Sequence, residues 1–174
     1  MTKTNIRAVS AIILTAALIA LAPLTLFIKE RFIPVKSLDG IELGMSEVDV
    51  TLVFGRLPDH TYEEDDGEFK YLSYATPRGL RVELLKLGDI FEVYNICSKY
   101  PIIKEKGISW SDSTEESVVK KLGSPSHVSI SEDGTKKYMS FSKVNLAFLF
   151  QGSKIKEACV TKALPIIFSK EYGS

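Results

Sequence analysis

Two histidines, two cysteines and one acidic run are the residues of this sequence whose types could do chemistry. His60 and His127 could share a metal ion, because imidazole is a common metal ligand, yet neither has further ligands at metal-binding spacing. The alternative, which we favour, is that both residues repeat the entry into a strand. The sequence therefore predicts no metal site.

The sequence carries no signature of a common enzyme class. It contains no nucleophile elbow, phosphate-binding loop, zinc-protease motif, Cys-x-x-Cys pair or dinucleotide fingerprint. We predict that the chain is not an enzyme and binds no cofactor. An enzyme or small-ligand sensor that uses His60 and His127 as its titratable pair is the least favoured hypothesis.

Cys97 and Cys159 each stand near the end of a predicted strand. In an oxidising compartment they could form a disulfide, which requires their Cα atoms to lie within about 7 Å of each other. The alternative is a pair of small buried apolar side chains. The sequence leaves both possibilities open.

An acidic run precedes two tyrosines. Such a run is usually a solvated turn, and its functional interpretation is a docking surface for a basic partner. Residues 37–100 carry 13 acidic and 6 basic side chains, a net charge of −7, whereas residues 101–174 carry 11 basic and 8 acidic ones, a net charge of +3. Aromatic side chains beside the run could anchor a protein partner. The predicted partner-binding residues are Glu63, Glu64, Asp65, Asp66, Glu68, Tyr71 and Tyr74.

The composition restricts the class of protein. The chain has 174 residues, 45% of them hydrophobic, and its 22 basic side chains balance 22 acidic ones. This length suits one ordinary domain or two small ones. Zero net charge argues against a general nucleic-acid binder, because such proteins carry a basic excess.

An uncharged stretch near the start of the chain predicts a membrane anchor. Residues 8–28 would span about 30 Å as a helix, which is the thickness of a bilayer core. Residues 1–7 would then be a short cytoplasmic N-terminus and residues 29–37 a linker. The chain would be a single-pass inner-membrane protein with its bulk in the periplasm. A cleaved signal peptide is the alternative.

The rest of the sequence contains a faint internal duplication. The segment from Ile41 to His60 matches the segment from Ile108 to His127 at an offset of 67 or 68 residues. We place the first repeat at residues 38–103, the second at residues 104–168 and a tail at residues 169–174. The aligned pairs include Val50 with Val118, Gly55 with Gly123, Pro58 with Pro125 and Cys97 with Cys159.

Each repeat begins with signals for a short helix, and strand signals follow. Ser46 is a good N-cap with Asp49 in a capping-box position, and Gly55 ends the helix; Ser113 or Thr114 would cap the second helix. Apolar and polar residues then alternate as in half-buried strands. The predicted fold is α+β: an N-terminal transmembrane helix followed by two tandem units, each a helical segment packed on an antiparallel β-meander. The sequence does not decide whether the two units share a sheet.

One string in the first repeat resembles a known family. Gly44-Met45-Ser46, then Val50, Phe54-Gly55 and Pro58, is similar to the SmpA/BamE family of outer-membrane assembly lipoproteins. The same helix-then-meander unit occurs doubled in the β-lactamase inhibitor protein. The resemblance implies a non-enzymatic binding module located in the cell envelope.

Two functional hypotheses follow. The first is a membrane-anchored envelope protein that acts as a protein-interaction module and supports the assembly or stability of an envelope complex. The alternative is an inhibitor or immunity protein that blocks a secreted enzyme or toxin through a concave face. Both hypotheses require a protein partner, and neither involves nucleic acid.

Overall fold

A computed structural model describes residues 33–162 of the chain. The chain divides into two units, Met1–Ile33 and Pro34–Ser174, and all of the elements below belong to the second unit. The predicted membrane anchor at residues 8–28 and the predicted tail at residues 169–174 lie outside the described residues.

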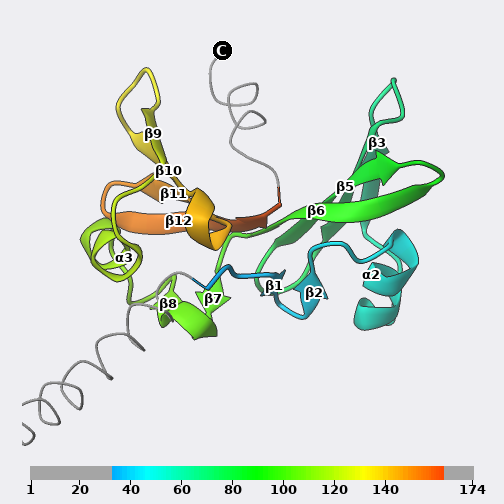
Figure 1. Cartoon of the computed structure of the whole chain (residues 1–174), viewed down its shortest axis with the longest axis horizontal. Coiled ribbons are helices and arrows are strands. Elements are labelled where there is room, and N and C mark those ends of the chain that lie inside the picture. Colours follow the sequence, from blue (N-terminus) through cyan, green and yellow to red (C-terminus); the bar gives the residue numbers. More distant parts are fainter. Residues whose placement is uncertain (1–32, 163–174) are drawn as a thin grey trace, which may run out of the picture. The chain divides into compact units, whose positions relative to one another are not determined.

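One eight-stranded antiparallel sheet dominates the fold (Figure 1). Two short strand pairs, β1 (Ser37–Leu38) with β2 (Ile41–Glu42) and β7 (Ile102–Ile103) with β8 (Ile108–Ser109), lie outside this sheet. In spatial order its strands are β3 (His60–Glu63), β4 (Phe69–Tyr74), β5 (Leu80–Leu87), β6 (Ile90–Ser98), β12 (Lys154–Thr161), β11 (Leu146–Gln151), β10 (Lys136–Phe141) and β9 (His127–Ile130).

The helices are short and begin where the capping signals predict. Helix α2 (Glu47–Phe54) has Ser46 as its N-cap, and Asp49 completes a capping box. Gly55 ends this helix in the left-handed conformation (φ 63°), which glycine adopts without steric cost. Helix α3 (Glu115–Leu122) has Thr114 as its N-cap, so the structure chooses Thr114 over Ser113. Two 3-10 turns, η1 (Lys104–Lys106) and η2 (Ser142–Val144), complete the helical content of the described residues.

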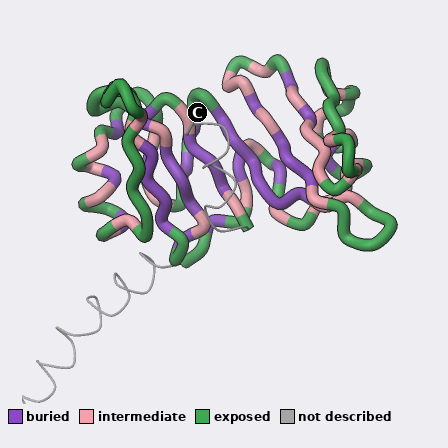
Figure 2. The backbone as a smooth tube through the Cα atoms, turned by 90° about the horizontal axis from the view of Figure 1, so that it is seen from above, coloured by how far each residue is buried: buried purple, intermediate pink, exposed green. Residues whose placement is uncertain are grey.

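The main hydrophobic core lies on the side of the sheet that carries α2 and α3. Val50 of α2 and Val118 and Leu122 of α3 belong to one buried cluster with strand residues such as Val82 and Phe148. Figure 2 shows buried residues along the middle of the strands and exposed residues in the outer turns. Burial of these apolar side chains is the main stabilising term for such a sheet.

The predicted architecture of two tandem units, each a helical segment packed on its own antiparallel β-meander, is wrong. The last strands of the two repeats, β6 and β12, pair with each other from Asn95–Thr161 to Ser98–Ala158, so the two meanders form one continuous sheet. Strands dominate residues 33–162, and the two α-helices of this range have only 8 residues each. The physical reason is that a lone four-stranded meander would leave the edge of its longest strand unpaired, and pairing removes that edge.

The predicted single-pass, periplasm-facing placement in the inner membrane also requires correction. No helix among the described residues is long and apolar enough to cross a membrane. The prediction therefore has no support in the structure.

Candidate functional site

The eight-stranded sheet has a second face, opposite α2 and α3, which we call the distal face. Figure 1 shows β3 and β9 rising at the two ends of a floor formed by β6 and β12, while the helices lie below that floor. Side chains that pair directly across antiparallel strands point to the same face. The register therefore places one row of eight residues across the distal face: His60, Ser73, Arg81, Cys97, Cys159, Ala147, Ser140 and His127.

This row settles the prediction for the two histidines. His60 lies on one edge strand and His127 on the other. Seven strand spacings of about 4.8 Å separate the two edges, so the histidines cannot share an ion or act as a catalytic pair. Both stand at the start of a strand, as the favoured interpretation predicts.

A disulfide bond lies at the centre of the row. Cys97 of β6 and Cys159 of β12 are bonded, with their Cα atoms 4.1 Å apart. Both residues are buried and face each other directly in the register. Of the two possibilities that the sequence leaves open, the structure therefore has the disulfide, which joins the two repeats where β6 pairs with β12.

A buried polar network surrounds the disulfide on the first-repeat side. Glu83 is buried and accepts hydrogen bonds of 2.9 Å from both the Tyr94 hydroxyl and Asn95 Nδ2. Arg81 forms an ion pair of 3.0 Å with the same carboxylate. Burial raises the pKa of Tyr94 far above its usual value, and the nearby Glu83 charge adds to this effect. The charge of Arg81 balances that of Glu83 within the network, so we interpret the network as a structural one.

Among the described residues, the grouping closest to a metal site consists of the two bonded cysteines and Glu157. The ligand atoms of Cys97, Glu157 and Cys159 lie within 4.8 Å of one another. The two sulfurs are bonded to each other, so neither offers a thiolate. The guanidinium of Arg81 stands 3.8 Å from Glu157 and competes with any cation for that carboxylate.

Apolar side chains gather on the distal face at the outer end of the first repeat. Tyr62 is 61% exposed, Ile90 54% and Leu87 48%. The register places Tyr62 beside Tyr71, Phe69 beside Leu85, and Leu87 beside Ile90, all on the distal face. We call this set the first-repeat patch; its members are Tyr62, Phe69, Tyr71, Leu85, Leu87 and Ile90.

A cavity of about 230 Å³ opens within this patch. Leu85, Leu87 and Tyr94 form apolar walls, and Glu92 and Lys162 stand at its polar side. The Lys162 ammonium lies 3.8 Å from the Glu92 carboxylate, and the Lys162 side chain is 57% exposed. The cavity therefore has apolar walls, and one long ion pair, between Lys162 and Glu92, lies beside it.

The second repeat is an internal control for this patch. Counting outward from the disulfide, each strand pair of the second repeat has the same register and the same bulge as its counterpart in the first. The antiparallel bridges Ser46–Glu92 and Thr114–Lys154 confirm that Glu92 and Lys154 are equivalent positions. Polar residues replace four apolar ones: Ser129 stands for Tyr62, Lys136 for Phe69, Gln151 for Leu85 and Lys156 for Tyr94. The position of Tyr71 keeps a tyrosine, Tyr138.

The predicted acidic residues border the first-repeat patch. Tyr71 donates a hydrogen bond of 2.6 Å to Glu64, which ties the acidic turn to the patch. Asp65 and Asp66 are exposed in the turn between β3 and β4, Glu68 is exposed just before β4, and Glu63 is the exposed last residue of β3, opposite Lys70. The structure thus brings together the predicted residues Glu63, Glu64, Asp65, Asp66, Glu68 and Tyr71.

The prediction that Tyr74 is exposed beside these residues is wrong. Tyr74 is buried on the helix side of the sheet, where its ring stacks on Phe54 of α2 with a centroid distance of 4.0 Å. The Arg56 guanidinium covers the ring at 5.7 Å. Tyr74 therefore supports the packing of α2 and does not belong to the site.

Sequence reasoning missed the aliphatic part of the patch. Leu85 and Leu87 continue the alternation of β5 on the face that carries Arg81 and Glu83. Two apolar residues on an otherwise polar face of the strand were the available signal.

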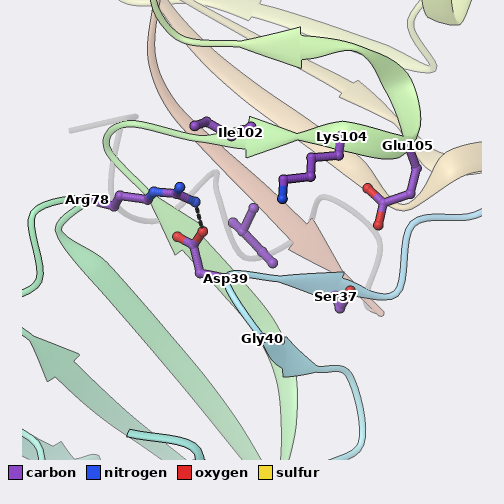
Figure 3. Close-up of a pocket in the computed structure, with 8 residues that line it drawn as sticks. Ser37, Asp39, Gly40, Arg78, Ile102, Lys104 and Glu105 are labelled. Carbon is purple, nitrogen blue, oxygen red and sulfur yellow. Dashed lines mark hydrogen bonds and ion pairs between the residues drawn. The ribbon is translucent and has the colours of Figure 1, made fainter.

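A second cavity, of about 300 Å³, lies beside the β1–β2 turn (Figure 3). Arg78 donates to Asp39 there, while Lys104 and Glu105 extend from the 3-10 turn η1. Its charged lining consists of two cations and two anions, so it favours no single charge. The first-repeat patch is the better candidate, because its apolar character and its acidic border both select a partner.

Comparison with known proteins gives little guidance. No protein-family model matches the chain, and no curated protein matches it. Among solved structures, the chain is similar to a DUF4309 family protein (YjgB) from Bacillus subtilis subsp. subtilis str. 168, with 13% sequence identity and a TM-score of 0.48. The similarity covers 78% of this chain and 91% of that one.

Proposed function

We propose that this chain is a non-catalytic protein-binding module whose first repeat presents the binding surface. The observation that carries the proposal is the contrast between the repeats. At the positions of Tyr62, Phe69 and Leu85, the first repeat carries aromatic and aliphatic side chains and the second exposes serine, lysine and glutamine. The fold does not require apolar residues at these positions, because the second repeat folds without them.

The size and composition of the patch support a protein partner. Exposed apolar clusters rimmed by polar residues are typical of interaction sites. Tyrosine in particular contributes large contact area at low conformational cost, and Tyr62 and Tyr71 lie with ring centroids 5.9 Å apart. The disulfide and the hydrogen bonds to Glu83 restrict the motion of the neighbouring strands β6 and β12, so the patch is preorganised for binding.

The test uses in-cell crosslinking and capture of the full-length chain through a tag at Ser174. The patch variant carries Tyr62→Ser, Phe69→Lys and Leu85→Gln, which are the residues that the second repeat has at these positions. The matched control carries Ser129→Ala, Lys136→Ala and Gln151→Ala in the second repeat. Both variants are first shown by urea denaturation to be folded.

The proposal predicts that the patch variant loses a partner that the wild-type chain and the control variant both retain. Equal capture by all three folded proteins would contradict it. A single stoichiometric soluble enzyme or toxin among the lost proteins would identify the module as an inhibitor or immunity protein.

A further inference from the structure

We infer that the first-repeat patch recognises a basic segment of its partner and takes one apolar side chain of that segment into the Leu85–Leu87–Tyr94 cavity. This inference rests on the proposed function and adds the chemistry of the partner. Three observations carry it: the size of the cavity, the sign of the surrounding charge and the placement of the first repeat's own cations.

The cavity has the size of a hole for a side chain. Its volume of about 230 Å³ lies below the range of about 300–1,000 Å³ that is typical of small-molecule sites. Its walls are apolar, and it opens among exposed aromatic and aliphatic residues rather than in an enclosed cleft. A leucine-sized or phenylalanine-sized anchor from a protein segment fits this setting, as in other interface hot spots.

The charge along the border of the patch is negative, and the cavity lining itself holds one anion and one cation. Exposed carboxylates of Asp65, Asp66 and Glu68 border the patch on one side, whereas Glu63 pairs with Lys70 in the register and so points to the helix side of the sheet. Glu92 stands at the cavity itself, and its contact with the exposed Lys162 side chain is 3.8 Å long, so an incoming cation can replace Lys162. A partner segment with lysine or arginine beside its apolar anchor therefore meets complementary charge.

The cations of the first repeat do not neutralise this border. Lys70 forms an ion pair of 2.8 Å with Glu47 of α2, and Lys70 and Lys86 both lie over the ring of Phe91, which places them with the helix side. Arg56 pairs with Asp59 at 2.9 Å. Arg81 lies on the distal face but is held between Glu83 and Glu157. An acidic partner would therefore be repelled at this surface.

The experiment measures binding of three fluorescent peptides to the full-length chain by anisotropy. One peptide alternates lysine and leucine, the second replaces each leucine with serine, and the third replaces each lysine with glutamate. We expect the lysine–leucine peptide to bind more than about tenfold more tightly than either of the others. Its affinity should fall when the salt concentration is raised. Equal binding of the lysine–leucine and glutamate–leucine peptides would overturn the inference.

Two variants separate the charge from the cavity. Asp65→Asn, Asp66→Asn and Glu68→Gln together should slow association about tenfold at low salt, while leaving the Tyr71–Glu64 hydrogen bond intact. Leu85→Gln should abolish the advantage of leucine over serine in the peptide. The matched control neutralises Glu116 and Glu132, exposed carboxylates of the second repeat, and should change neither. If the control weakens binding as much as the acidic-border variant does, the charge effect is non-specific and the inference fails.

Two further measurements test whether something other than a partner protein occupies the patch. Self-association of the wild-type chain that the patch variant abolishes, measured by sedimentation, would assign the patch to a second copy and overturn the inference. A more than about tenfold rise in peptide affinity on deletion of residues 163–174 would assign the cavity to the chain's own segment and also overturn it. If the patch variant loses its cellular partner but the peptides show no charge preference, the proposed function stands and only this inference fails.

Discussion

Removal of the Cys97–Cys159 disulfide should destabilise the protein by several kcal/mol. The two residues are 62 positions apart, and closing a loop of that length in the unfolded chain corresponds to about 4 kcal/mol in the chain-entropy description. The double substitution Cys97→Ala and Cys159→Ala also removes buried sulfur from the smaller cluster on the distal face. We expect a loss of about 2–4 kcal/mol in the free energy of unfolding, because measured values usually fall below the entropic limit.

Urea denaturation of the full-length chain measures this loss. Wild-type protein in its oxidised form is compared with the double variant and with wild-type protein reduced by a thiol. The reduced protein should show most of the loss, since it lacks the crosslink between β6 and β12, and the double variant should lose somewhat more because it also lacks the buried sulfur atoms. A loss below about 0.5 kcal/mol in both would refute the reasoning, because the crosslink would then restrict no conformational freedom of the unfolded chain.

Three further predictions concern single residues. Ser46→Ala should cost about 1 kcal/mol in urea denaturation, because it removes the two hydrogen bonds of the Ser46 hydroxyl, which donates to the Asp49 carboxylate and accepts from the Asp49 backbone N–H, whereas Ser46→Thr keeps the hydroxyl and should restore most of the loss. Tyr74→Ala should cost about 3–5 kcal/mol by the same measurement, because the buried ring fills the space under Phe54, and Tyr62→Ala on the exposed surface should cost far less. Hydrogen bonds from Ser131 and from Thr135 lower the pKa of Asp133 to about 2 from the value of 3.8 that it has when unfolded. The unfolded state therefore binds a proton first, and stability should fall as the pH falls from about 4 to about 2; Asp133→Asn should flatten that part of the pH profile, and an unchanged slope would contradict the assignment.

The sequence predicts the local features of this fold better than its long-range ones. The ends of the first helix depend on neighbours within a few residues, such as Ser46 with Asp49 and the glycine at position 55, so the pattern of types locates them. The pairing of β6 with β12 joins residues 62 positions apart, and no local pattern encodes it. The single sheet was therefore out of reach of local reasoning, although the equivalent positions of the two cysteines were visible.

The same distinction explains the outcome for the candidate site. The acidic run and Tyr71 are found by composition and by proximity in sequence, and they border the patch. Tyr74 lies three residues from Tyr71, and an odd step along a strand moves a side chain to the opposite face. Assigning faces requires knowing which side α2 covers, and that depends on tertiary packing between Phe54 and Tyr74. Leu85 and Leu87 can be recognised as part of a surface patch only when the register places them beside Phe69 and Ile90.

The central claim is that the first repeat binds a protein partner through the distal face and the second repeat does not. The most direct measurement is the ratio of captured partner between the Tyr62→Ser, Phe69→Lys, Leu85→Gln variant and the second-repeat control variant, normalised to folded protein. The account predicts a loss of more than about tenfold for the first-repeat variant alone, because substitution of central apolar anchors typically removes most binding energy. A ratio near one, with both variants folded, would contradict it.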